Sequence, residues 1–214
     1  MAGLYFYVPK GKTEDVVSCG LKLSEWYDRE FELSSISGNK KFIKALLNPR
    51  DDDSKLDDPN YQCLRLEVDP QYCLVGDSAL YELGLKNDTL MEHYKKGLTP
   101  LKNYRFGTFL IPEVLVMISI LPDCIEVPGK AMDIPILYES SMALYLNNTL
   151  SKHEEVWKDS GNHLLYAYYF YLETKGKVVR YEDNDAGNAV FFYVDSDEYA
   201  VCKLPKEEYN IDRK

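Results

Sequence analysis

The side chains best suited to chemistry in this sequence form an ordered series of short elements, not one compact motif. A glutamate can stabilise developing positive charge or orient a hydroxyl. An arginine can bind a phosphate through two parallel hydrogen bonds, and aromatic side chains can stack on a flat ring. A serine hydroxyl adds a hydrogen-bonding group to this set. In chain order, the candidates are Tyr5, Phe6, Tyr7, Arg50, Ser78 and Glu113.

Every candidate except Ser78 also has an ordinary structural interpretation. Glu113 opens an apolar run, so it could be a solvated carboxylate at a strand end. Arg50 precedes Asp51–Asp53 and could simply pair with these acids. The side chains of Tyr5–Tyr7 alternate across a strand, so they could be plain core packing. The sequence leaves both interpretations open for each group.

Motifs of several common enzyme classes are absent from the chain. There is no P-loop, no GxGxxG, no GxSxG, no HExxH and no EF-hand loop. The five cysteines are scattered without a CxxC pair, and the three histidines lie far from any pair of them. We therefore expect no metal site, and we predict reduced, mostly buried thiols.

The charge of the chain bears on its partners. The formal net charge is −10, which disfavours a protein that coats nucleic acid through its overall field. Lys40, Lys41 and Lys44 could guide an anionic acceptor, or they could form a solvated strand edge. The acidic run Asp51–Asp58 would repel DNA if it lined the same cleft.

Length and composition indicate a globular protein with a full core. The chain has 214 residues, of which 45% are hydrophobic and 28% charged; both fractions are ordinary. No apolar run reaches the ~18 residues of a membrane-spanning helix, so no membrane association is expected. The N-terminal sequence lacks the features of a signal peptide, which favours a cytoplasmic location.

The elements that must position the candidates lie within residues 1–127, which we predict to be one core domain. Alternation and β-branched content predict strands, and capping residues with terminal glycines predict short helices. Residues 34–39 and the acidic run 51–58 are predicted loops. The predicted strands are 4–8, 61–69, 73–75, 113–120 and 125–127, and the first predicted helix is 14–19.

The segment PGKAMD, residues 128–133, is the best internal boundary. Beyond it we predict helices over 134–158 and 162–175, followed by three short strands. The second domain, 128–214, is thus a helical hairpin with a small antiparallel sheet, packed on the core. Its tyrosine-rich helix could pack against that core or mark a partner surface.

Four segments, taken in order, resemble the ADP-ribosyltransferase superfamily, and most closely its DarT type, whose toxin members modify DNA. The opening LYFYVPKGKTEDVVSCGLKLS is similar to the family's first strand, helix and Gly-Leu pair. KALLNPRDD resembles the arginine element, VGDSALYE the third element, and PEVLVMISILPDCI the glutamate strand. The resemblance covers residues 4–127.

The resemblance implies an α+β fold with a bent mixed sheet and short helices. It also implies that NAD is a substrate and that ADP-ribose passes to a macromolecular acceptor, nucleic acid or protein. Nicotinamide leaves through an oxocarbenium-like ribose, so Glu113 would be the catalytic carboxylate, and Arg50 would neutralise the pyrophosphate. The other NAD-binding residues would be Tyr5, Phe6, Tyr7 and Ser78.

Two departures from the family pattern bear on activity. Phe6 stands where the family usually carries a histidine on the first strand, which affects recognition of the nicotinamide ribose. Asp77-Ser78-Ala79 lacks the family's Gly-Asn. The alternative function is therefore a catalytically inactive interaction module of the same fold.

Overall fold

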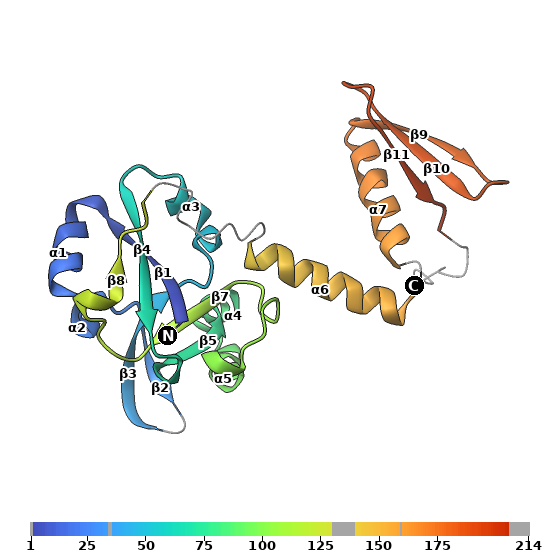
Figure 1. Cartoon of the computed structure of the whole chain (residues 1–214). Coiled ribbons are helices and arrows are strands. Elements are labelled where there is room, and N and C mark those ends of the chain that lie inside the picture. Colours follow the sequence, from blue (N-terminus) through green and yellow to red (C-terminus); the bar gives the residue numbers. More distant parts are fainter. Residues whose placement is uncertain (1, 34–35, 130–139, 159, 206–214) are drawn as a thin grey trace. The chain divides into compact units, whose positions relative to one another are not determined.

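The computed structural model is an α+β structure with antiparallel sheets (Figure 1), as predicted at the level of fold class. It describes residues 2–33, 36–129, 140–158 and 160–205. Contacts between Cα atoms divide the chain into two compact units, Met1–Asn148 and Thr149–Lys214. This division differs from the predicted one after residue 127, because the first turns of helix α6 (Ser141–Val156) contact the first unit. The segment 130–133 of the predicted boundary and the start of the predicted helix, 134–139, lie outside the described residues.

The first unit contains two sheets, with strand orders β1-β4-β8 and β2-β3-β7-β5-β6. Tyr5 of β1 and Leu46, just after β3, exchange backbone hydrogen bonds of 2.9 and 2.8 Å that connect the two sheets. Every strand pairing among the described residues is antiparallel, whereas we expected a mixed sheet. The strands are β1 (Ala2–Pro9), β2 (Arg29–Leu33), β3 (Ile36–Ala45), β4 (Tyr61–Val68), β5 (Cys73–Asp77), β6 (Thr99–Pro100), β7 (Pro112–Val116) and β8 (Ile125–Glu126).

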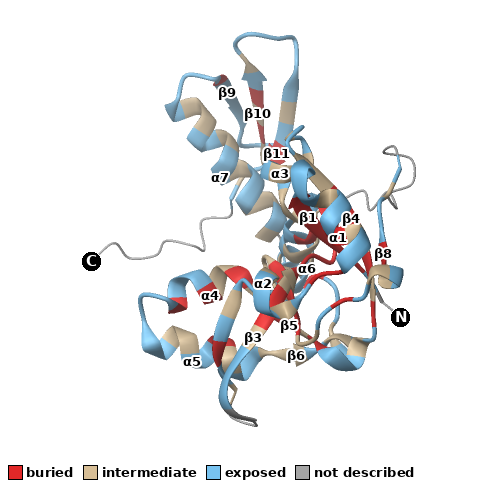
Figure 2. Cartoon of the chain, turned by 90° about the vertical axis from the view of Figure 1, so that its left-hand side faces the viewer, coloured by how far each residue is buried: buried red, intermediate tan, exposed pale blue. Residues whose placement is uncertain are grey.

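Strand β1 shows the alternation that its sequence predicts. Leu4, Phe6 and Val8 face the main core, while Tyr5 and Tyr7 pack with Leu46 and Cys63 on the other side. Figure 2 shows buried residues in red along β1, β3, β4 and β5. Both faces of β1 are thus covered, which fits an aromatic and β-branched strand inside a two-sheet core.

Strand β7 is buried at all five positions, as its apolar sequence indicates. It is shorter than the predicted strand 113–120, because the chain leaves the sheet after Val116. Ile120 instead forms an isolated bridge with Leu21. This bridge ties the end of the apolar run to the segment that follows the first helix.

The short helices of the first unit lie close to their predicted places. Helix α1 (Thr13–Cys19) matches the predicted helix 14–19 to within one residue. Gly20 ends it with φ 80°, and a Cβ atom there would collide with the carbonyl of Ile120, so glycine is required. The other helices are α2 (Leu23–Trp26), α3 (Asp53–Leu56), α4 (Ser78–Gly84) and α5 (Asp88–Gly97).

Two predicted loops are partly regular structure. Strand β3 begins at Ile36, inside the predicted loop 34–39, because it pairs with β2 in a hairpin. The acidic run 51–58 contains the end of a 3-10 helix (Pro49–Asp51) and helix α3. Asn48 caps the 3-10 helix by accepting a hydrogen bond of 3.0 Å from the Arg50 backbone N–H. In α3, Asp52 accepts a hydrogen bond of 2.6 Å from the Ser54 hydroxyl and forms an ion pair of 3.0 Å with Lys55, which stabilises the turn despite the like charges.

In the second unit, helix α7 (Ser160–Thr174) covers one face of a three-stranded antiparallel sheet. The strand order is β11-β10-β9, and these strands confirm the three predicted near the C-terminus. Their bounds are β9 (Val178–Asp183), β10 (Asn188–Tyr193) and β11 (Tyr199–Lys203). Of the tyrosines in α7, Tyr166 and Tyr169 pack on this sheet, whereas Tyr168 and Tyr171 are exposed.

None of the described helices has the length and apolar character needed to cross a membrane.

Candidate functional site

Glu113, at the start of β7, is completely buried and surrounded by donors. Its Oε1 accepts a hydrogen bond of 2.7 Å from the Tyr94 hydroxyl. Its Oε2 accepts two from Arg29, at 3.1 Å from Nε and 3.0 Å from Nη2. The interpretation of Glu113 as a solvated carboxylate is therefore wrong, since its exposed fraction is 0%.

Lys44 and Ser78 complete the surroundings of this carboxylate. The Lys44 Nζ lies 3.6 Å from Glu113 Oε2 and donates a hydrogen bond of 3.0 Å to Ser78 Oγ. Arg29 Nη2 lies 3.4 Å from the same hydroxyl. Ser78 and Glu113, two of the predicted site residues, are thus brought into one polar cluster. Lys44 also belongs to this cluster, so the alternative that it is a solvated residue at a strand edge is wrong.

The sheet register explains why these groups meet. Gly76 of β5 pairs with Glu113 of β7, and Ser78 follows directly at the start of α4. A Cβ atom on Gly76 would lie 2.7 Å from the Tyr94 ring, so the missing side chain lets Tyr94 reach the carboxylate. Lys44 comes from β3, the other neighbour of β7. The site is therefore built from the centre of the five-stranded sheet.

Arg29 extends the cluster towards the surface. Its Nη2 donates a hydrogen bond of 2.9 Å to Glu82 Oε1, and its guanidinium lies 4.0 Å from the centre of the Tyr81 ring. Glu113 and Glu82 supply two negative charges, and Arg29 and Lys44 supply two positive ones. Opposite charges thus compensate one another, which a buried carboxylate requires.

The pKa values of the neighbours fit this arrangement. Burial raises the pKa of Tyr94 far above its ordinary value, and the adjacent Glu113 carboxylate raises it further. The phenol is therefore a proton donor to Glu113 at any physiological pH. Burial alone would lower the pKa of Arg29, but Glu113 and Glu82 raise it, so the guanidinium stays charged.

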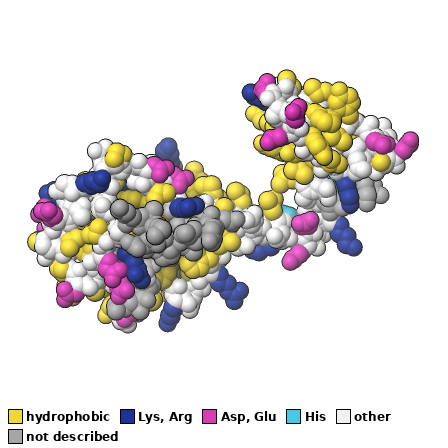
Figure 3. All heavy atoms as spheres, turned by 45° about the horizontal axis from the view of Figure 1, so that its top comes forward, with side chains coloured by type: hydrophobic (Ala, Val, Ile, Leu, Met, Phe, Trp, Pro, Cys, Tyr) yellow, Lys and Arg dark blue, Asp and Glu magenta, His cyan; other side chains and the backbone are white. Residues whose placement is uncertain are grey.

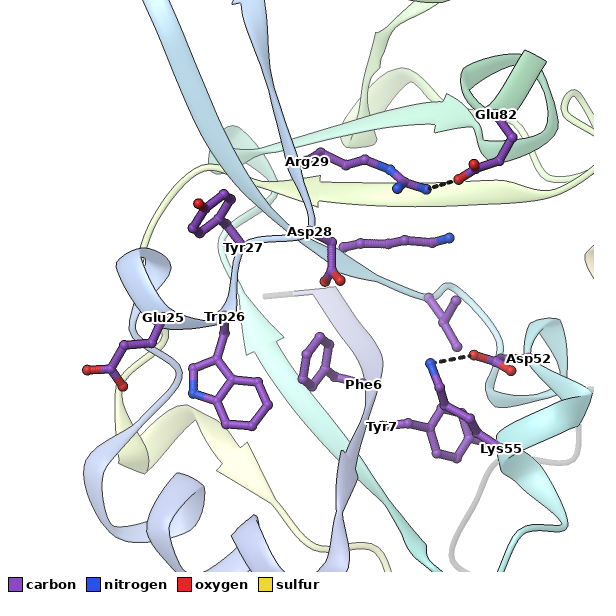
Figure 4. A pocket seen from close by; sticks show the side chains of 12 residues that line it. Phe6, Tyr7, Glu25, Trp26, Tyr27, Asp28, Arg29, Asp52, Lys55 and Glu82 are labelled. Carbon is purple, nitrogen blue, oxygen red and sulfur yellow. Dashed lines mark hydrogen bonds and ion pairs between the residues drawn. The ribbon is translucent and has the colours of Figure 1, made fainter. Parts of the chain in front are cut away.

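A cleft of about 360 Å³ opens beside this cluster (Figure 4). Phe6 and Trp26 meet edge to face on one side of it, with ring centres 6.0 Å apart. Arg29 and Lys44 supply cations to its wall, whereas Glu113 lies behind them and does not line it. The lining residues are Phe6, Tyr7, Glu25, Trp26, Tyr27, Asp28, Arg29, Lys44, Leu46, Asp52, Lys55 and Glu82.

The predicted site residues other than Ser78 and Glu113 fall into three places. Phe6 and Tyr7 line the cleft, and the Tyr7 hydroxyl donates a hydrogen bond of 2.8 Å to the Pro49 carbonyl. Tyr5 is buried on the same face of β1 as Tyr7 but does not line the cleft. Arg50 is exposed in the 3-10 helix Pro49–Asp51 and does not line it either.

Four residues of the site were not predicted from the sequence: Arg29, Tyr94, Glu82 and Trp26. One signal could have found the first two: a glutamate inside an otherwise apolar run needs compensating donors if it is buried. Arg29 lies in the short strand REFEL, whose buried Phe31 faces the same cluster of rings as Tyr94. The sequence does not show which arginine or tyrosine supplies the donors, since these partners lie 84 and 19 positions from Glu113.

Asp51 fixes the start of helix α6 next to Arg50. Its carboxylate accepts hydrogen bonds from the Ser141 backbone N–H at 2.8 Å and from the Ser141 hydroxyl at 2.7 Å. Burial raises the pKa of Asp51, and the hydrogen bonds from Ser141 oppose that shift. Asp51 is therefore engaged in capping a helix, so it is not available as a ligand-binding group.

The described residues contain no group of three or more His, Cys, Asp or Glu side chains that could hold a metal ion. Cys63, Cys73 and Cys202 are buried thiols, and Cys19 is exposed.

Comparisons of the chain with protein-family models, with curated proteins and with solved structures found no match in any of the three.

Proposed function

We propose that the chain binds NAD in the cleft and transfers ADP-ribose to a macromolecular acceptor, as a DarT-like ADP-ribosyltransferase. The observation that carries the proposal is the meeting of two resembling segments at one site. Phe6 and Tyr7 of the opening segment line the cleft whose wall contains Arg29 and Lys44, the two cations bound to Glu113. Phe6 and Glu113 are 107 positions apart in the sequence, so local sequence does not account for a cleft that joins Phe6 to the two cations paired with Glu113.

The chemistry of the cleft suits a ligand with both rings and phosphates. Phe6, Trp26 and Tyr27 present aromatic surfaces on which a base can stack. Arg29 and Lys44 supply positive charge that a pyrophosphate can pair with. An NAD molecule with its pyrophosphate at these cations would place its ribose groups near the Glu113 cluster.

The transfer step needs a negative charge beside the ribose. The bond between C1′ and the nicotinamide nitrogen breaks, and the bonding electrons leave with nicotinamide. The acceptor's nucleophile then bonds to C1′, and its proton passes to water. Glu113 would stabilise the positive charge on the ribose. Phosphate oxygens would compete with Glu113 for Arg29 and Lys44, so ligand binding would leave the carboxylate less neutralised than it is in the free protein.

A second candidate is a catalytically silent binding module that uses the same cleft. Two observations favour it: Glu113 is completely buried with both oxygens hydrogen-bonded, and Phe6 offers no hydrogen bond to a ribose. Of the nearby hydroxyls, Tyr7 already donates to Pro49, and Ser78 accepts from Lys44. This module would bind the nucleotide without releasing nicotinamide.

One experiment separates the two candidates. NAD binding by calorimetry and nicotinamide release should be measured for the full chain and for Glu113→Gln, with denatured DNA and unfolded protein offered as acceptors. A transferase binds NAD and releases nicotinamide, and Glu113→Gln keeps binding but loses release. Binding without release by the wild type supports the silent module. No binding at millimolar NAD refutes the transferase and the nucleotide-binding form of the module, and favours an interaction module that does not use NAD.

A further inference from the structure

The outer face of the C-terminal sheet is an exposed apolar surface. Side chains alternate across a strand, and α7 covers only the side formed by Val178, Ala189, Phe191 and Cys202. We define the opposite side as the outer face. It consists of Val179, Tyr181, Val190, Phe192, Tyr199 and Val201, and all of these except Val190 are 43 to 63% exposed. Figure 3 shows hydrophobic side chains, in yellow, gathered on this unit.

The size of the outer face is on the scale of a protein interface. Aromatic side chains bury about 150–250 Å² each when fully covered, so three rings and three valines offer several hundred Å² per copy. Standard interfaces bury about 800 Å² per partner. Monomeric proteins rarely expose contiguous apolar patches above a few hundred Å². An exposed apolar surface of this size is therefore expected to be covered by a binding partner.

The register of the strands arranges the outer face in two rows. One row is Val179, Phe192 and Tyr199, and the other is Tyr181, Val190 and Val201. The rings of Tyr181 and Tyr199 lie 5.9 and 5.7 Å from that of Phe192, one on each side of it. Each outer strand therefore carries one tyrosine and one valine, in opposite order along the sheet.

We propose that the outer face is a homodimer interface, in which two copies stack face to face around a twofold axis parallel to β10. Such an axis places β9 of one copy over β11 of the other. Tyr199 then faces Val179 of the second copy, and Tyr181 faces Val201, so that each large side chain meets a small one. Phe192 lies close to the axis and meets its own counterpart. The face is thus self-complementary, as a twofold interface requires.

The neighbouring polar row supports the same axis. Asp183, Asn188 and Lys203 are register partners at the edge of the outer face. The twofold axis brings Asp183 of one copy over Lys203 of the other, so opposite charges meet twice at the rim. The acidic turn Asp195–Glu198, at the other end of the strands, would repel a nucleic acid stacked on the rings.

The test uses the position of Phe192 near the axis. Sedimentation velocity of the full chain, from micromolar to submillimolar concentration, should show a monomer–dimer equilibrium. Phe192→Glu and Phe192→Lys should each be monomeric, because like charges then face each other. An equimolar mixture of the two should recover the dimer, which also shows that both variants are folded. Tyr199→Ser, at a side chain 63% exposed, should weaken association roughly tenfold or more.

Tyr171→Glu, on the exposed side of α7, is the matched control and should leave the dimer intact. A wild-type chain that stays monomeric over this range overturns the proposal and leaves the face to a different protein or to another part of the same chain. A dimer that survives in both Phe192 variants, or that Tyr171→Glu dissociates, also overturns it.

Discussion

Arg29 donates two hydrogen bonds to a single oxygen of Glu113, from Nε at 3.1 Å and from Nη2 at 3.0 Å, across 84 positions of sequence. The glutamate is completely buried, while the arginine side chain keeps 11% exposure and lines the cleft. The pair therefore links the centre of the sheet to the cleft wall. A ligand that pairs with Arg29 or Lys44 in the cleft would therefore change the charge balance around Glu113.

Arg29→Met should destabilise the fold strongly. Among the described residues, the substitution leaves Lys44 as the one remaining cationic partner of the buried Glu113 carboxylate. Breaking a buried ion pair from one side costs about 3–5 kcal/mol. Urea unfolding at neutral pH measures the loss. The control is Arg65→Met, which breaks the exposed Arg65–Glu126 pair of 3.2 Å and should cost at most about 1 kcal/mol. Equal losses in the two variants would contradict a structural role for the Arg29–Glu113 pair.

Lys44→Met should abolish the stabilisation of the chain by NAD. Ligand at 100 times its dissociation constant stabilises a protein by about 2.7 kcal/mol, which thermal unfolding detects against each variant's own ligand-free baseline. Lys40→Met is the matched control, since Lys40 lies on the same strand but does not line the cleft. Arg50→Met tests separately whether Arg50 binds the pyrophosphate, as the family resemblance implies. If NAD no longer stabilises the Arg50→Met variant but still stabilises Lys44→Met, the phosphate-binding residue is Arg50 and not Lys44.

Phe6→His should increase nicotinamide release if the cleft is a weakened transferase site. The imidazole supplies a hydrogen bond that Phe6 cannot, and a net hydrogen bond contributes about 0.5–1.5 kcal/mol. The same substitution disturbs the edge-to-face contact with Trp26, so a modest fall in melting temperature accompanies it. Release is measured by chromatography beside the wild type. A stability loss with no change in NAD binding or release points to the silent module.

The buried thiols should make the fold less stable as the pH rises above about 9. Burial raises the pKa of Cys63 to about 11 and that of Cys73 to about 12, from an ordinary value of 9.0. Above pH 9.0 the unfolded thiols release protons that the native thiols keep. The native state then binds more protons, so the free energy of unfolding falls with rising pH.

Urea unfolding at about pH 8 and about pH 10 measures this slope, to which each such group contributes at most about 1.4 kcal/mol per pH unit. Cys73→Ala should be less stable at the lower pH, because it leaves a small cavity, but should show a shallower fall. Cys19→Ala, at an exposed thiol, should keep the wild-type slope. A Cys73→Ala slope equal to that of the wild type would contradict the assignment.

Local pattern in the sequence was enough to predict several elements. The alternation in β1, the helix before Gly20 and the three C-terminal strands are all present near their predicted positions. These elements depend on side-chain periodicity, capping and glycine conformation, which act over a few residues. The coarse α+β class follows from their number and type.

The surroundings of Glu113 and the two rows of the outer face were decided by tertiary structure alone. Glu113 meets Lys44 because β7 pairs with β3, and it meets Arg29 because β2 pairs with the other side of β3. A shift of one residue in β7 would turn the Glu113 side chain to the opposite face. In the same way, Phe192 lies between Tyr181 and Tyr199 because three strands pair in register. Sequence periodicity shows which side chains share a face of one strand, but pairing between distant strands decides which of them meet, because that choice depends on the burial of the whole sheet.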